Sequence, residues 1–271
     1  MLIRAEGLLP ESRGLSAPGR KQTKEELDRE DVPLEHAAAS EYRARTARAN
    51  FMAVDRPDVS YAVKELCRGM SAPTKRDSEA LKRLARYLLV TPRVVLHFGW
   101  QHKPKLLSVY TDSDWAGCVR TRKSTSGGVV MRGSHVLKTW STTQATVALS
   151  SAEAELIALV KGAAEGLAVT SLLRDLHEDV TVCVGVDSSA AIGVCRRTGV
   201  GKIRHLDTRL LWVQDMVRAG SIAVEKVAGE ENPADLLTKH LASDVLTGHL
   251  ARLGCWEREG RARIAPQCTS V

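Results

Sequence analysis

Four carboxylates of this sequence stand where an expected strand ends or an expected helix begins. Asp112 follows the apolar residues 106–110, and Asp187 follows a second buried strand. Glu155 falls in the first turns of a long expected helix, and Asp235 stands at the start of the last one. Side chains at such ends converge on one edge of a sheet. Because clustered carboxylates repel one another and are tolerated where cations lie among them, the pattern predicts a metal site.

The chemistry expected of such a site is hydrolysis of a phosphodiester. Two Mg²⁺ ions roughly 4 Å apart would bridge a phosphate, one activating water and the other stabilising the leaving oxygen. Mn²⁺ is the expected substitute, and no small-molecule cofactor is expected. A polar loop with three cations follows Asp112, and these would bind phosphates without reading sequence: Arg120, Arg122 and Lys123.

A second group of cations lies on an expected helix over residues 74–89. Lys82, Arg83 and Arg86 gather with Lys75 on the side opposite its apolar stripe. Two interpretations of this basic face stay open at this point. It is either a solvated helix surface or a surface that follows the phosphates of a nucleic acid.

Hydrophobic periodicity divides the chain into four parts. Residues 1–33 are rich in Gly, Pro and charge and are expected to form a disordered leader. A mostly helical segment (34–100) and an α/β domain (105–242) follow, and a tail (243–271) offers little beyond a short helix near 245–253. The expected helices span 34–52, 59–70, 74–89, 152–166, 167–177, 188–196, 207–217 and 233–241. The expected strands span 94–98, 106–110, 127–131, 135–140, 181–186 and 220–227.

Bulk composition favours an intracellular protein with a polyanionic partner. The net charge is +7 and the pI is near 9.2. Six cysteines are scattered without a Cys-x-x-Cys pair, which is typical of reduced thiols in the cytoplasm or nucleus. No apolar run reaches the ~18 residues of a membrane span, so no membrane partner is expected. Aromatic residues make up 4% of the chain, too few for a platform that stacks single strands.

Six motifs in this order resemble the ribonuclease H domain of copia-type long-terminal-repeat retrotransposon polyproteins. They are Tyr-Thr-Asp-Ser-Asp-Trp-Ala-Gly (110–117), Lys-Ser-Thr-Ser-Gly-Gly (123–128), Ala-Leu-Ser-Ser-Ala-Glu-Ala-Glu (148–155), Asp-Ser-Ser-Ala-Ala-Ile (187–192), Arg-His-Leu-Asp-Thr-Arg (204–209) and Asn-Pro-Ala-Asp-Leu-Leu-Thr-Lys (232–239). Residues 55–63 and 81–88 resemble the C-terminal end of the reverse transcriptase that precedes that domain.

The resemblance implies an α/β, ribonuclease H-like fold with a five-stranded mixed sheet flanked by helices. It also implies cleavage of the RNA strand of RNA–DNA hybrids, with four metal ligands: Asp112, Glu155, Asp187 and Asp235. Residues 34–100 would be a remnant of the reverse transcriptase thumb or connection, and the reverse transcriptase core is a candidate partner. No Tyr-x-Asp-Asp polymerase motif occurs in the sequence, so this chain does not copy nucleic acid.

Two assignments within this site have competitors. Glu153 and Glu155 are two residues apart on a helix and therefore point about 200° apart, so only one faces the site. The resemblance favours Glu155, which directly precedes an apolar run, and leaves Glu153 as a first-turn acid favoured by the helix dipole. His205 is a minor candidate for moving protons. The loop 228–232 has no histidine, although cellular ribonucleases H often place one there.

Three functional classes remain open from the sequence. The first is a metal-dependent endonuclease acting on hybrid. The second is a catalytically idle remnant of the same fold that binds nucleic acid or protein. The third is a DNA-cutting relative, since integrases and resolvases share the fold. A magnesium-dependent cleavage assay on hybrid, duplex DNA and duplex RNA separates them.

Overall fold

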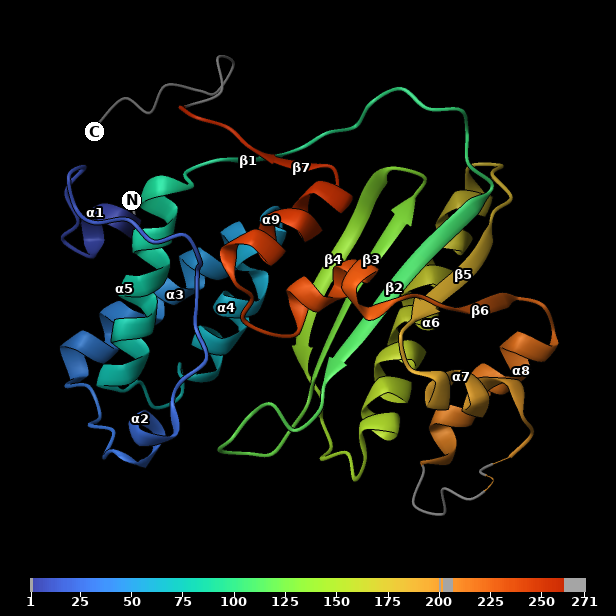
Figure 1. Ribbon diagram of the computed structural model, residues 1–271, viewed down its shortest axis with the longest axis horizontal. Coiled ribbons are helices and arrows are strands. Elements are labelled where there is room, and N and C mark those ends of the chain that lie inside the picture. The colour runs from blue at the N-terminus through green and yellow to red at the C-terminus, as the bar shows by residue number, and fades with distance from the viewer. Residues whose placement is uncertain (1, 200, 202–206, 261–271) are drawn as a thin grey trace.

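The computed structural model describes residues 2–199, 201 and 207–260, and a five-stranded mixed sheet lies at its centre (Figure 1). Its strands lie in the order β4-β3-β2-β5-β6. The three strands β4, β3 and β2 pair antiparallel, and β5 and β6 continue the sheet parallel to β2. This confirms the expected α/β class. The strands are β2 (Leu106–Asp114), β3 (Thr125–Arg132), β4 (His135–Thr143), β5 (Thr181–Val186) and β6 (Ile222–Lys226).

One face of the sheet is covered by helix α6 (Ser151–Asp175), with α7 (Ser189–Arg196) and α8 (Trp212–Arg218) beyond it. The expected helices 152–166 and 167–177 are one continuous helix. The reason is that Gly166 serves close packing rather than termination: a Cβ there would lie 2.8 Å from Val182 and 2.9 Å from Val109. Helix α6 therefore lies unusually close to the sheet along β2.

Helix α6 is also long and apolar enough, by length and composition, to cross a membrane. This differs from the expectation that no segment has these properties. The apolar character has a local explanation, because α6 packs along β2, β3 and β5 and buries Leu156, Leu159 and Ala163 against them. A central core helix passes the same test as a membrane span.

The other face of the sheet is covered by helices from both ends of the chain. α4 (Pro57–Arg68) and the 3-10 helix η3 (Pro233–Leu237) lie against the strands. α3 (His36–Ala53), α5 (Lys75–Val90) and α9 (Ser243–Arg252) pack against α4 and η3. One hydrophobic cluster joins Val63 of α4, Leu84 of α5, Val129 of β3 and Leu250 of α9. The helical segment and the α/β domain, expected as separate parts, thus share a core.

The tail holds more structure than its sequence indicates. The expected short helix is present as α9, and β7 (Cys255–Glu257) then pairs antiparallel with β1 (Val94–Leu96) in a separate two-stranded sheet. The strand expected over 94–98 therefore forms outside the central sheet. The paired segments lie about 160 residues apart in the sequence, so no local sequence pattern predicts that they pair.

Residues 2–33, expected to be a disordered leader, lie along α5. They contain the short helices α1 (Leu2–Ala5) and α2 (Lys24–Asp28), the second of which begins with a capping box formed by Thr23 and Glu26. The Leu15 N–H donates to the Arg86 carbonyl at 3.2 Å, and Arg86 Nε donates to the Arg13 carbonyl at 2.7 Å. These contacts with α5 stabilise a segment whose composition alone favours disorder.

The start of α4 is fixed by a buried ion pair, and its loss should destabilise the whole molecule. Arg56 Nη2 lies 2.6 Å from Asp58 Oδ2, and the Tyr87 hydroxyl donates to the same oxygen at 2.9 Å. The substitution Arg56→Met leaves the fully buried Asp58 carboxylate without its cation, so we expect the free energy of unfolding to fall by about 3–5 kcal/mol. Urea unfolding followed by circular dichroism measures this. The double variant Arg56→Met/Asp58→Leu removes both charges and should recover most of the lost stability. Equal losses of stability in the single and double variants would show that the unpaired Asp58 charge is not the cause.

Candidate metal centre

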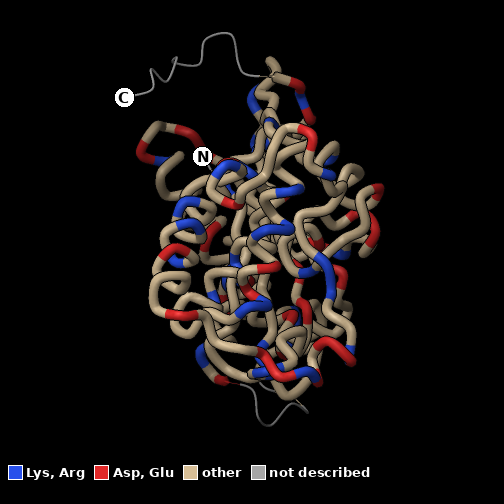
Figure 2. Tube along the Cα trace, turned by 90° about the vertical axis from the view of Figure 1, so that its left-hand side faces the viewer, with Lys and Arg blue, Asp and Glu red and all other residues tan. Residues whose placement is uncertain are grey.

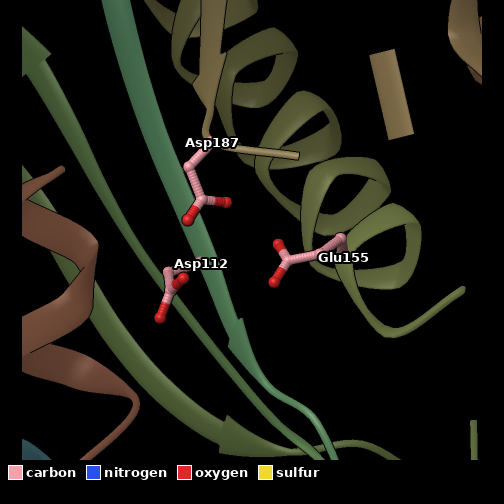
Figure 3. A group of neighbouring side chains, drawn as sticks. All are labelled: Asp112, Glu155 and Asp187. Atoms are coloured by element: carbon pink, nitrogen blue, oxygen red, sulfur yellow. The ribbon is translucent and has the colours of Figure 1, made fainter. Parts of the chain in front are cut away.

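Three of the four predicted acids meet at one point. Asp112 comes from β2, Glu155 from the first turns of α6, and Asp187 from the residue after β5 (Figure 3). Each offers a carboxylate oxygen, and these oxygens lie within 4.8 Å of one another. Asp112 is 4% exposed and lies inside β2 rather than in a turn after it, which corrects the expectation. Pairing of β2 with β3 continues to Asp114, and this keeps Asp112 in regular strand geometry.

The structure places Glu155 in this cluster and Glu153 outside it. Ser150 caps α6 by accepting the Glu153 N–H at 3.2 Å, and the Glu153 carboxylate accepts the Leu149 N–H at 2.7 Å. Glu153 is therefore directed back over the start of the helix. This is the geometry expected when two residues two positions apart face different sides.

The fourth acid, Asp235, lies on η3, beside the other three. The expected last helix is this short 3-10 helix, and two side chains hold it against β2. Asn232 Nδ2 donates to the Thr111 carbonyl at 2.8 Å, and the Thr238 hydroxyl donates to Asp112 Oδ2. Gly127 of β3 permits this approach, because a Cβ there would lie 2.9 Å from the Ala234 carbonyl oxygen. Asp235 thereby comes within electrostatic reach of Asp112.

Three carboxylates of the centre, those of Glu155, Asp187 and Asp235, have raised pKa values. Burial, followed by the charges of Asp112 and Asp187, raises the pKa of Glu155 to about 9. Burial and the charge of Asp112 raise the pKa of Asp235 to about 6, and the same two causes raise the pKa of Asp187. The full set of negative charges is therefore unfavourable without additional cations.

A divalent cation fits the residues present. Glu155 Oε2 is buried and has no hydrogen-bond partner among the residues that the structure describes, although it faces two other carboxylates. A buried oxygen of this kind normally has a partner, so its lack of one is a cost that a bound cation removes. The donors are all carboxylate oxygens, the ligands preferred by hard cations such as Mg²⁺ and Mn²⁺.

Lys239 is a member of this centre that sequence reasoning did not single out. Its Nζ lies 2.9 Å from Asp235 Oδ2, one helical turn away in sequence. Burial acts to lower the pKa of Lys239, but the hydrogen bond to Asp235 and the charges of Asp112 and Asp235 outweigh it and raise the pKa. The ammonium group therefore supplies a fixed positive charge among the acids. The i, i+4 spacing from Asp235 was the available signal.

Beside the acids lies a hollow of about 590 Å³ between the 229–230 turn and α9. Asp187, Asp235 and Lys239 line one side, and His249 and Arg252 of α9 line the other. His249 is 1% exposed, and its Nδ1 has no hydrogen-bond partner in the described part of the chain. The hollow is therefore lined in part by a buried histidine of α9, a helix for which the sequence predicted no function.

The two predicted basic groups lie in different places. Arg120, Arg122 and Lys123 occupy the 115–124 loop, directly after the strand that carries Asp112. Lys82, Arg83 and Arg86 lie on α5, where Lys82 is exposed and the two arginines are half-buried. The leader covers part of this face, since Arg86 donates to the Arg13 carbonyl. On the side of the molecule that carries α3 and α5, acidic and basic residues are interspersed (Figure 2).

Two residues of the 204–209 motif, His205 and Asp207, lie outside this centre or outside the described residues. His205 lies outside the described residues. Asp207 accepts the Arg209 N–H at 2.9 Å and caps the 3-10 helix η1 (Thr208–Leu211), which leads into α8. The long helix expected over 207–217 is therefore two consecutive segments. Asp207 organises the start of the first segment.

The chain is similar in sequence to retrovirus-related Pol polyproteins. No family model matches the chain. The retrovirus-related Pol polyprotein from transposon TNT 1-94 of Nicotiana tabacum is 35% identical over 193 residues, 69% of this chain and 14% of that protein. The corresponding protein from transposon RE1 of Arabidopsis thaliana is 31% identical over 220 residues, 79% of this chain and 15% of that protein. A crystal structure of LC11-RNase H1 in complex with an RNA/DNA hybrid covers 49% of this chain and 93% of that one, with 20% identity and a TM-score of 0.35.

The order and pairing of the strands, with helices on both faces of the sheet, define a ribonuclease H-like fold. The chain belongs to the family of copia-type, retrovirus-related Pol polyproteins, and the two relatives described above come from plant transposons. It spans about 15% of the length of the two relatives described above.

The raised pKa values predict how metal-free protein responds to pH. The folded state holds the Glu155 proton until pH about 9, whereas the unfolded state releases it near 4.5. Stability should therefore fall as pH rises between these values, and Asp235 should add to the fall up to about pH 6. Thermal unfolding in EDTA between pH 5 and 9 measures the effect. Glu155→Gln should flatten the profile and Glu153→Gln should leave it unchanged; identical profiles for all three proteins would refute the explanation.

Lys239 should compete with a bound metal for the same acids. Lys239→Met removes one positive charge from the centre, so we expect Mg²⁺ to bind roughly tenfold more tightly and the metal-free protein to become less stable. Titration calorimetry without nucleic acid measures the affinity. Lys103→Met is the matched control, because Lys103 is exposed and pairs with Glu178, which is not an acid of the centre. An unchanged affinity in Lys239→Met would show that its charge does not oppose the metal.

Proposed function

We propose that this chain is a metal-dependent nuclease that hydrolyses the RNA strand of RNA–DNA hybrids. The observation that carries the proposal is the meeting of Asp112, Glu155 and Asp187 within 4.8 Å, with one buried carboxylate oxygen left without a partner. Acids arranged at this cost to stability are explained by a cation that they bind and by chemistry that needs it. Membership of the Pol polyprotein family supports the same reading.

The residues that would hold Mg²⁺, or Mn²⁺ in its place, are Asp112, Glu155 and Asp187, with Asp235 beside them. When bound, two such ions lower the pKa of water and stabilise the leaving oxygen of a phosphodiester. The protein's own contribution is to fix the acids before substrate arrives. Thr238 holds Asp112 by a hydrogen bond, and Lys239 holds Asp235 by an ion pair.

RNA–DNA hybrid is the proposed substrate, because the expected family activity is directed at it and the site lies beside a basic loop. Arg120 and Arg122 are exposed on that loop and would bind phosphates of either strand. The 2′-hydroxyl groups of one strand distinguish a hybrid from duplex DNA. The proposed protein partner is the reverse transcriptase core, whose polymerase motif this sequence lacks.

The central test removes one acid at a time. Asp112→Asn keeps the size of the side chain but removes a charge that binds the metals, so cleavage of labelled hybrid in Mg²⁺ should fall by at least about 10²–10³-fold. Hybrid binding without Mg²⁺ should be unchanged or stronger, because repulsion between the acid and the phosphates is reduced. Glu155→Gln should be as severe, and Glu153→Gln should be near wild type.

Wild-type protein supplies the decisive comparison among the three functional classes. Magnesium-dependent cleavage of hybrid, with duplex DNA and duplex RNA left intact, supports the proposal. Binding of hybrid without any cleavage would make the chain an idle binding module. Preferential cleavage of duplex DNA would assign it to the DNA-cutting class.

A further inference from the structure

Two loops flank the metal centre, and a tryptophan links them. The 115–124 loop follows β2, which carries Asp112, and the 144–150 loop leads into α6, which carries Glu155. The indole N–H of Trp115 donates to the Ala148 carbonyl at 3.1 Å. Trp115 therefore lies between the two elements that bring Asp112 and Glu155 together.

Trp115 is fixed but remains exposed to solvent. Its exposed fraction is 47% although its only polar atom is already bonded, and Leu149 and Val147 of the neighbouring loop are 66% and 46% exposed. A ligand that covers the exposed part of a fixed aromatic side chain gains buried apolar area. It does so at little cost in conformational entropy, because the side chain is already held in place. The exposed part is apolar, so the ligand must offer apolar surface.

The loop that carries Trp115 is held in a constrained conformation. Ala116 and Arg122 adopt left-handed backbone angles, with φ of 53° and 56°, which cost free energy in residues other than glycine. Arg68 of α4 donates to Cys118 Sγ and, at 3.2 Å, to Thr121 Oγ1. These contacts from outside the loop offset the strain and fix the outline of the loop.

The charges of this loop indicate what lies against it. Arg120 and Arg122 are exposed, and neither forms an ion pair with any acid in the part of the chain that the structure describes. The loop after β2, the strand that bears Asp112, thus presents two unpaired cations and a fixed, half-exposed indole. This combination matches a polyanion with apolar edges. A nucleic acid has both features: phosphates, and the sugar and base edges of its grooves.

We propose that Trp115, with Leu149, packs against the sugar and base edges of the substrate beside the metal centre, while Arg120 and Arg122 bind its phosphates. The inference rests on the proposed function for the identity of the substrate. The wide, shallow minor groove of an A-like hybrid exposes these edges to a protruding side chain. Trp115 is then a substrate-binding residue that contributes affinity without charge.

An apolar contact and a phosphate contact respond differently to salt, and this separates them. Fluorescence anisotropy of labelled hybrid in Mg²⁺-free buffer, at several salt concentrations, gives both the affinity and its salt slope. Trp115→Ala should weaken binding roughly tenfold to a hundredfold with an unchanged slope, because no phosphate contact is lost. The double variant Arg120→Gln/Arg122→Gln should reduce the slope by about two.

Two further variants control for a purely structural role of Trp115. Trp115→Phe keeps a ring but loses the N–H that bonds Ala148, so near-normal affinity is expected if the ring contacts substrate. Trp256→Ala removes an equally exposed tryptophan, 48%, from β7 at the opposite end of the sheet (Figure 1), and should leave affinity unchanged.

Wild-type affinity retained in Trp115→Ala overturns the inference and leaves the proposed function intact. Equal losses in Trp115→Phe and Trp115→Ala, with lowered melting temperatures, also overturn it, because Trp115 would then only brace the two loops. If the wild type prefers duplex DNA and this binding also depends on Trp115, the Trp115 surface is supported as a binding site. The proposal that the chain cleaves RNA–DNA hybrids is then contradicted. Wild-type protein that binds no nucleic acid contradicts both.

Discussion

Mutual repulsion among buried carboxylates is the constraint on which the rest of this structure depends. Asp112, Glu155 and Asp187 are held within 4.8 Å, so the surrounding elements must oppose their separation. β2 lies at the centre of the sheet and is clamped from both faces. On one face a Cβ at Gly162 of α6 would lie 2.3 Å from Thr111, and on the other Asn232 bonds the Thr111 carbonyl. The site is rigid because its central strand is packed this closely on both sides.

Lys239 and a bound metal are alternative solutions to the same electrostatic problem. The Lys239 ammonium pairs with Asp235, but no cation of the described residues pairs with Glu155, whose raised pKa reflects burial and two neighbouring acids. In the metal-free protein, Lys239 therefore offsets only part of the negative charge of the acids, on the Asp235 side of the cluster. The acids nearest Lys239 are stabilised, while the Glu155 side of the cluster is left to be neutralised by a proton or by a metal.

Residues placed by local pattern were predictable from the sequence, whereas residues placed by distant contacts were not. Asp112 and Asp187 lie at the same end of adjacent parallel strands, and helical phase separates Glu155 from Glu153. The role of Lys239 depends on η3 docking against β2, and β1 pairs with β7, which lies far from it in the sequence. The order of the leader likewise arises from α5, since its own composition opposes folding.

The helices that precede the α/β domain belong to its core and to its site. α4 contributes Val63 and Leu66 to the cluster that covers the sheet, and a domain cut at residue 105 would expose that apolar face. α4 also reaches the side on which we propose that substrate binds: Lys64 Nζ donates to Thr125 Oγ1 at 2.8 Å at the start of β3, and Arg68 holds the loop that carries Trp115. A segment resembling the end of a polymerase therefore shapes the loop of the proposed nuclease. This gives a physical reason for the two sequence blocks to remain on one chain.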